Sequence, residues 1–336
     1  MIVSRLKSAA VRLSDSEMFA GVLDRLERRS QGRRFLRVLA YHRIDDEHPE
    51  DQFYPGLIST TPAGFAAQME CLSARYHVCT MDEVVAAVES RSHDLPPDSV
   101  LLTFDDATLD LARHAWPILK SMDLPATVFV PTAYPDQPDR HFWWDRLYRA
   151  VMHSRPGTCI PVSDSTSVTL TNREQRLATF RQLKERLKQL PHDRFQILLS
   201  RIVQAADVPD PAHNNVLGWP ELKRLHTEGL TLAPHTHTHP MLNQLPDAQI
   251  REEVDQSLDT LRTQLGSVCP ALAYPAGGVS DSAVRECEAA GIKVAFTTAR
   301  GVNHHSLQQP LRLKRINVGG RTSNALLRLQ LANWGR

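Results

Sequence analysis

Short apolar runs alternate with helical patterns along most of the chain. "FLRVLAYH" (35–42), "SVLLTFDD" (99–106) and "ATVFVPT" (126–132) have the length and composition of buried strands. Between the first two runs, "TPAGFAAQMECLSARY" (61–76) predicts a helix opened by Thr61, with Pro62 in its first turn. Repeated strand–helix units of this kind predict an α/β fold with a parallel sheet, open or closed into a barrel.

Residues 133–217 interrupt this alternation. They contain "HFWWDRLYRAVMHS", a predicted hairpin around "SVTLTN" and charged helical sequence from 173 to about 206. The strand–helix pattern resumes afterwards with "WPELKRLHTEG", "LTLAPHT", "DAQIREEVDQSLDTLRTQLG", "ALAYPAGG", "DSAVRECEAAG" and "VAFTT". We therefore expect one domain over 36–336 with a mainly helical insertion at about 133–217, preceded by a basic helical segment over 1–35.

Charge is balanced overall but not at the N-terminus. The 336 residues carry a formal net charge of +1, which argues against nucleic-acid binding through bulk charge. From residue 1 to 43 there are ten Lys or Arg and four Asp or Glu. This segment is interpreted either as a solvated basic helix or as a peripheral contact with an anionic membrane surface or glycan.

The sequence pattern favours a cytoplasmic location. The first residues lack the unbroken apolar stretch of a secretory signal, and no run is long enough to span a bilayer. The five cysteines are scattered and form no CxxC pair, as expected of reduced thiols. Attachment at the inner membrane face is the alternative that the basic segment leaves open.

Polar clusters follow three of the predicted strands: Asp105–Asp106, 235–239 and 274–278. Catalytic groups in parallel barrels lie at the carboxyl ends of the strands. Two imidazoles and one carboxylate form a familiar ligand set for a divalent metal, with open positions left for water and substrate. A neighbouring carboxylate can then take a proton from the water that the metal acidifies.

The histidine cluster "HTHTHP" (235–240) allows two ligand pairs. His235 and His237 would form the H-x-H pair of amidohydrolase-like barrels, although those proteins normally place it on their first strand. His235 and His239 would form an i, i+4 pair on a chain that turns at Pro240. The spacing alone leaves both pairs open.

"TFDD" (103–106) followed by H-[ST]-x-x-H-P (235–240) resembles the polysaccharide deacetylases of carbohydrate esterase family 4, the NodB-homology fold. "VLAYHRI" (38–44), "PATVFVPT" (125–132) and "YPAGG" (274–278) look like the same family in the same order. The likeness covers roughly residues 38–318. It implies a distorted parallel (β/α)7-type barrel, here with the mainly helical insertion.

The resemblance also implies roles for individual residues. Asp106, His235 and His239 match the metal-binding triad, and Asp105 matches the general base. The expected cofactor is a divalent metal, with zinc as the default and cobalt, nickel or manganese able to occupy the same ligands. The implied reaction removes acetyl groups from N-acetylated sugars of a polysaccharide or glycan precursor. Substrate contacts and a backbone oxyanion donor are expected at Tyr274, Pro275 and Ala276.

Several positions depart from the family pattern. Ala273 stands where an arginine often steadies the base, so Arg43 or Arg315 is expected to supply that charge. The family's C-terminal leucine–histidine motif, which usually provides the general acid, has no match in "LRLKRINV". His42 is the preferred general acid instead, and His304 and His305 are the second choices. Ala107 stands where glycine is common.

The insertion offers aromatic side chains for a sugar. Trp143 and Trp144 have faces that suit sugar C–H surfaces, although one ring of such a pair more often packs into the core. Trp144 and Arg315 are included among the expected substrate contacts, and Asp145 is a weaker candidate. Two other functions stay open: an amidohydrolase-like hydrolase of another amide, and a catalytically silent carbohydrate-binding barrel.

Overall fold

The computed structural model describes residues 21, 25, 34–48, 51–90 and 95–332. The basic segment expected over 1–35 therefore lies almost entirely outside the described residues. Among the described residues, no helix combines the length and the apolar character that a membrane crossing requires.

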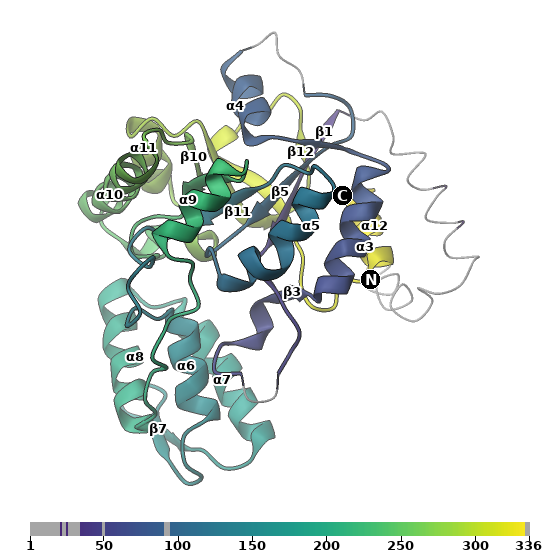
Figure 1. Cartoon of the computed structure of the whole chain (residues 1–336). Coiled ribbons are helices and arrows are strands. Elements are labelled where there is room, and N and C mark those ends of the chain that lie inside the picture. Colours follow the sequence, from purple (N-terminus) through teal and green to yellow (C-terminus); the bar gives the residue numbers. More distant parts are fainter. Residues whose placement is uncertain (1–20, 22–24, 26–33, 49–50, 91–94, 333–336) are drawn as a thin grey trace.

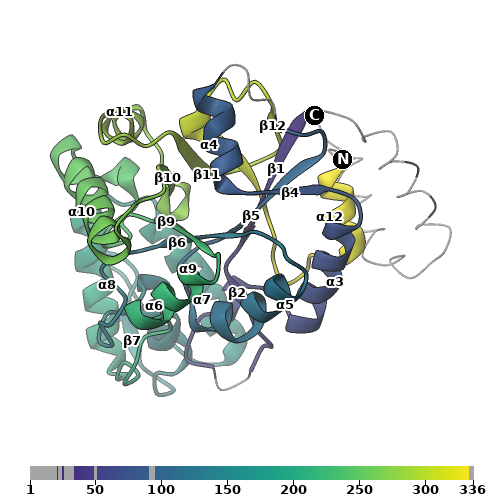
Figure 2. The same cartoon turned by 45° about the horizontal axis from the view of Figure 1, so that its top comes forward.

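A parallel sheet of seven strands curves into a nearly closed barrel, which confirms the predicted (β/α)7-type fold (Figures 1 and 2). In spatial order the strands are β10 (Ala271–Ala273), β11 (Val294–Arg300), β13 (Leu313–Asn317), β1 (Phe35–Tyr41), β5 (Ser99–Phe104), β6 (Thr127–Val130) and β9 (Thr231–Pro234). No backbone ladder among the described strands joins the two ends of this order, β9 and β10.

Helices cover the outside of the barrel: α3 (Pro62–Ser73), α5 (Trp116–Ser121), α9 (Trp219–Thr227), α10 (Asp247–Leu265), α11 (Asp281–Ala289) and α12 (Asn324–Leu331). A π-helical turn, Leu111–Ala115, leads directly into α5. The predicted start of α3 is confirmed, because the Thr61 hydroxyl accepts a hydrogen bond from the Gly64 amide.

Alternation along the strands separates an interior cluster from an outer one. Leu36, Val38, Leu101, Phe129 and Phe296 pack in one buried cluster. Their strand neighbours pack with the surrounding helices in a second cluster, which includes Leu39, Tyr41, Leu102, Phe104 and Val128. Side chains alternate between the two faces of a strand, so every second residue points into the barrel. A residue that continues this interior row just past the carboxyl end of a strand therefore points into the barrel mouth.

Smaller strands lie beside the main sheet. β4 (His77–Cys79) pairs with β5 and leads into α4 (Met81–Glu89), and β2 (Arg43–Ile44) pairs with β3 (Ile58–Thr60). β12 (Asn303–His304) pairs antiparallel with the first residues of β1. This pairing places β12 at the end of the barrel opposite to the carboxyl ends of the parallel strands.

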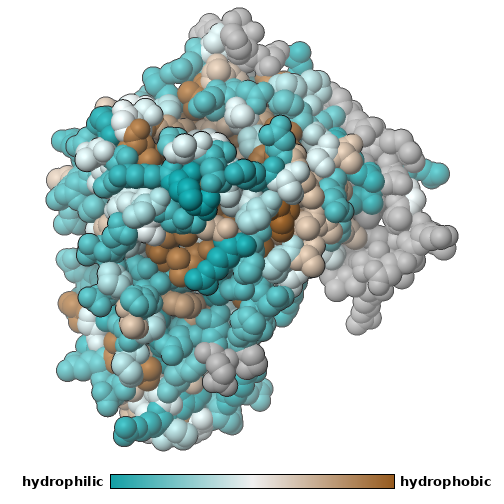
Figure 3. Space-filling model, in the orientation of Figure 1, coloured by the Kyte–Doolittle hydropathy of each residue, from teal (hydrophilic) through white to brown (hydrophobic). Residues whose placement is uncertain are grey.

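The insertion forms a separate helical layer between β6 and β9, seen below the barrel in Figure 1. It consists of α6 (Trp143–Met152), the antiparallel hairpin β7 (Cys159–Pro161) and β8 (Ser167–Thr169), α7 (Arg173–Leu187) and α8 (His192–Ala206). Its apolar side chains make a third buried cluster around Leu147, Phe180 and Leu199. Figure 3 shows a mainly hydrophilic surface on this face.

Candidate active site

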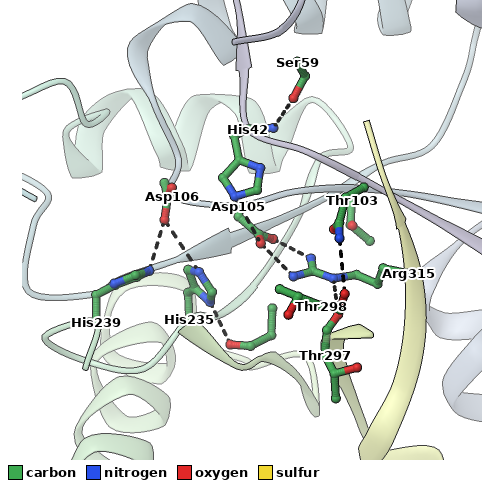
Figure 4. Close-up of polar contacts among 12 residues, drawn as sticks. His42, Ser59, Thr103, Asp105, Asp106, His235, His239, Thr297, Thr298 and Arg315 are labelled. Carbon is green, nitrogen blue, oxygen red and sulfur yellow. Dashed lines mark hydrogen bonds and ion pairs between the residues drawn. The ribbon is translucent and has the colours of Figure 1, made fainter. Parts of the chain in front are cut away.

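Four polar side chains continue the interior-facing rows of the barrel strands. Asp105 follows Leu101 and Thr103 at the end of β5, and His42 and His235 follow β1 and β9. Arg315 lies two residues after the interior Leu313 on β13. Residues far apart in the chain therefore meet at the barrel mouth (Figure 4).

Asp106, His235 and His239 bring three ligand atoms within 4.8 Å of one another, and all three residues are buried. The Asp106 Oδ1 atom lies 3.6 Å from His235 Nε2 and 3.3 Å from His239 Nε2. Two ligands of one tetrahedral ion at ~2.0–2.1 Å stand about 3.4 Å apart. Asp106 Oδ1 also has no hydrogen-bond partner among the described residues, so this set fits a divalent metal.

The His235 ring is held by the neighbouring strand. Its Nδ1–H donates to the Ala273 carbonyl oxygen at 2.7 Å, which leaves Nε2 directed at Asp106. Burial lowers the pKa of His235 to about 4, although the Asp105 carboxylate opposes this shift. The imidazole is therefore neutral at pH 7, as a metal ligand must be. The same hydrogen bond links the ends of β9 and β10, between which the described strands form no backbone ladder.

A tight turn separates the two histidines of this cluster, His235 and His239. Thr236 (φ 63°) and His239 (φ 63°) adopt left-handed backbone conformations, and the His239 amide donates to the Thr236 hydroxyl at 3.1 Å. His237 faces another way, with its Nδ1 2.9 Å from the Thr132 hydroxyl. The geometry brings together the i, i+4 pair and excludes the H-x-H pair from the cluster.

Asp105 forms a buried bidentate ion pair with Arg315. Arg315 Nη1 and Nη2 donate to the two Asp105 carboxylate oxygens at 2.7 and 2.8 Å, and Nε donates to the Thr297 carbonyl. Burial alone would raise the pKa of Asp105, but the guanidinium charge outweighs it and holds that pKa well below its usual range. Arg43 instead pairs with Asp45 and Asp51. Of the two expected arginines, Arg315 therefore supplies the positive charge beside Asp105.

The expected substrate contact by Arg315 does not fit this placement. The side chain is fully buried behind Asp105, does not line the cavity, and is committed at three of its nitrogens. It is positioned to orient Asp105 rather than to touch a sugar.

His42 lies beside the same carboxylate, with Nε2 3.8 Å from Asp105 Oδ2 and about a quarter of its side chain exposed. It lines the cavity over the cluster. His304 lies on β12, paired with the start of β1, and His305 follows it. Both are at the opposite end of the barrel, so neither second-choice histidine reaches the site.

The chain matches the polysaccharide deacetylase family model over residues 92–295. The chain belongs to this family. No curated protein matches it in sequence.

Solved structures share the fold at low identity. The deacetylase PplD of Streptococcus pyogenes, described in complex with acetate, is 21% identical with a TM-score of 0.59 (88% of this chain, 98% of that one). IcaB of Ammonifex degensii is 19% identical with a TM-score of 0.58, over 90% of this chain and 98% of that one. The BpsB deacetylase domain of Bordetella bronchiseptica is 18% identical with a TM-score of 0.52, over 86% of this chain and 97% of that one.

The backbone at Ala107 explains why glycine is common at this position of the polysaccharide deacetylase pattern. Ala107, where glycine is common, is buried with φ 52°, a conformation that glycine adopts without strain. Alanine at this position therefore carries a backbone strain that glycine would avoid. Asp106 (73°) and Ala276 (51°) also have positive φ, as Thr236 and His239 do. Such backbone strain, about 1–3 kcal/mol per residue, is typical of functional sites.

A cavity of about 250 Å³ lies over the cluster, between the barrel mouth and the insertion. Ala276 lines it, whereas Tyr274 is fully buried and donates its hydroxyl to the Leu311 carbonyl, and Pro275 is buried. Only Ala276 of these three expected contacts therefore reaches the cavity with its side chain. Gly277 has no room for a Cβ, which would lie 2.0 Å from the Thr298 hydroxyl.

The two tryptophans of α6 have different environments. Trp144 lines the cavity but is buried, stacked on Phe142 at 4.4 Å and edge-on to His239. Trp143 is half-buried and lines both this cavity and a second one of about 600 Å³ beside His239. Trp143 is the ring more open to a sugar. Asp145 is buried away from the cavity and accepts from the Tyr54 amide at 2.7 Å.

Proposed function

We propose that this chain is a metal-dependent deacetylase that hydrolyses the acetamide of N-acetylated sugars in a polysaccharide or glycan precursor. The observation that carries the proposal is the side-by-side placement of a buried Asp–His–His set and an Arg-paired carboxylate at the mouth of a family barrel. Family membership supports the acetylated carbohydrate as the substrate class.

Asp106, His235 and His239 would hold the metal, and zinc suits this ligand set. A divalent ion bound there would polarise the acetyl carbonyl and acidify a water. Asp105 then accepts the proton from the attacking water. Its pairing with Arg315 keeps the carboxylate ionised and fixes its direction.

Collapse of the tetrahedral species requires a proton on the departing amine. His42 is the group we assign to this step, because it lines the cavity next to Asp105 and its side chain is partly exposed. The backbone N–H of Ala276 is the proposed additional donor to the developing oxyanion, because Pro275 has no N–H and the Tyr274 N–H donates to the Phe296 carbonyl.

Two other functions have less support. A carbohydrate-binding barrel without activity is disfavoured because Arg315 takes the place of the missing motif arginine and His42 stands beside the base. An amidohydrolase-like hydrolase is disfavoured because His237 contacts Thr132 instead of the cluster.

Acetate release from a panel of N-acetylated glycans, measured with and without added zinc after chelation, tests the proposal. We expect release from at least one glycan, lost on chelation and restored by zinc. Absence of release from every glycan with a full complement of metal would favour the silent binding barrel.

The metal content of two variants distinguishes the His235/His239 pair from the His235/His237 pair as the metal ligands. We expect His239→Ala to lose most of its bound metal, because one of three protein ligands is removed, whereas His237→Ala keeps a stoichiometric amount. Elemental analysis of both purified variants after dialysis checks this. Equal loss from the two variants would contradict the assignment.

A further inference from the structure

Two lysines of the insertion line the catalytic cavity. Lys184 and Lys188 lie one turn apart on or just after α7, and both border the cavity that contains Asp105 and Asp106. Residues four apart share a face of a helix, so both ammonium groups approach the cavity from one side. They come from the insertion, whereas the proposed reacting groups come from the barrel.

Neither lysine has a carboxylate partner within salt-bridge distance in the described part of the chain. Lys184 Nζ donates to the Tyr54 hydroxyl at 3.2 Å and lies 5.1 Å from the centre of that ring. An ammonium group has three donors, so two remain for a ligand. Burial lowers the pKa of Lys188, which the adjacent Glu185 only partly offsets. Half-buried ammonium groups of this kind differ from ordinary solvated surface lysines.

The carboxylates of the cavity do not neutralise these lysines. Asp105 is already paired with Arg315, and Asp106 faces the two ligand histidines. Two like charges four residues apart also repel each other slightly. The pair therefore leaves an excess of positive charge next to the reacting groups, open to an anion from solution.

We infer that Lys184 and Lys188 select substrates in which the N-acetylated sugar carries an anionic group, a phosphate or a carboxylate, on or next to the sugar. This inference rests on the proposed function and names its substrate class. The same charge disfavours glycans that already carry free amines, because deacetylated sugars are cationic at neutral pH.

The test compares a neutral methyl glycoside of N-acetylglucosamine, N-acetylglucosamine 1-phosphate and the methyl glycoside of the corresponding N-acetylated uronic acid. The latter two distinguish phosphate from carboxylate. Acetate release by the zinc-loaded protein gives kcat/KM, and calorimetry on the metal-free protein gives affinity without turnover. We expect one anionic compound to be preferred about tenfold or more over the neutral one, as charged hydrogen bonds provide.

Lys184→Gln and Lys188→Gln should each reduce this anionic-to-neutral ratio several-fold, and the double variant should abolish it. Lys223→Gln is the matched control, because Lys223 is exposed on α9 and lines neither cavity. For wild type alone, the preference should weaken as salt is raised from about 0.01 to 1 M. This titration keeps the test decisive if a variant fails to fold.

Equal binding of all three compounds by wild type, or a preference that survives in the double variant or in high salt, would overturn the inference. Acetate release from the neutral glycoside with no anionic preference would overturn the inference alone. Anion-selective binding with no acetate released from any glycan would instead overturn the deacetylase proposal.

Discussion

Asp105→Asn should lower kcat for acetate release by a factor of about 10²–10⁴ while metal content stays at the wild-type level. Removal of a general base has an effect of this size. The three proposed ligands Asp106, His235 and His239 are untouched, so binding of the ion is expected to persist. Steady-state kinetics on the best glycan of the panel, combined with elemental analysis, checks both parts.

The asparagine places an amide NH2 next to one guanidinium nitrogen of Arg315, so folding must be verified separately. Unfolding curves of the variant and wild type serve this purpose. Full turnover by a folded, metal-replete variant would remove Asp105 from the role of base. Metal loss in a folded variant would show that Asp105 is a ligand instead.

Arg315→Met should cost about 3–5 kcal/mol of the free energy of unfolding, because it leaves the Asp105 carboxylate buried without its partner. This is the largest stability effect that we expect from a single substitution at the site. Urea denaturation of the metal-free protein at pH 7 measures it. Activity should fall as well, since Asp105, the proposed base, loses the bidentate contact that directs its carboxylate.

Two further variants test whether this loss of stability comes from the buried ion pair. Arg312→Met breaks a surface ion pair with the exposed Asp281 and is expected to cost no more than about 1 kcal/mol. The double variant Asp105→Asn/Arg315→Met should recover part of the lost stability, because neither charge remains. A double variant as unstable as the sum of the two single changes would show that the pair is not energetically coupled.

Much of the barrel could be predicted because its signals are local. Short apolar runs and helix-capping residues predicted the strand–helix order, and the insertion bounds at about 133–217 stay a prediction. The short helix α4 escaped prediction, although Thr80 and Glu83 form a capping box that the sequence displays. Its neighbour β4 has only three residues, too few to show a period.

The residues of the candidate site could be predicted where they are close together in the sequence, and not where the order of the strands brings them together. Asp105, Asp106 and the histidines share motifs, whereas Arg315 is 210 residues from its partner. Arg43 was an equal candidate until the barrel placed β13 beside β1. Lys184 and Lys188 gave no signal, because a basic pair on a charged helix is ordinary until the helix is seen above the cavity.

The bond from His235 to the Ala273 carbonyl has a consequence for how the barrel opens. It spans the only gap in the ring of seven parallel strands described here, so one of the proposed metal ligands also closes the ring. Local separation of β9 from β10 would withdraw His235 from Asp106. Amide protons along this gap are therefore expected to exchange with solvent faster than those of β5 inside the ladder. A solvent or a substitution that widens the gap is expected to lower the affinity for the proposed metal, even where none of the three proposed ligands is changed.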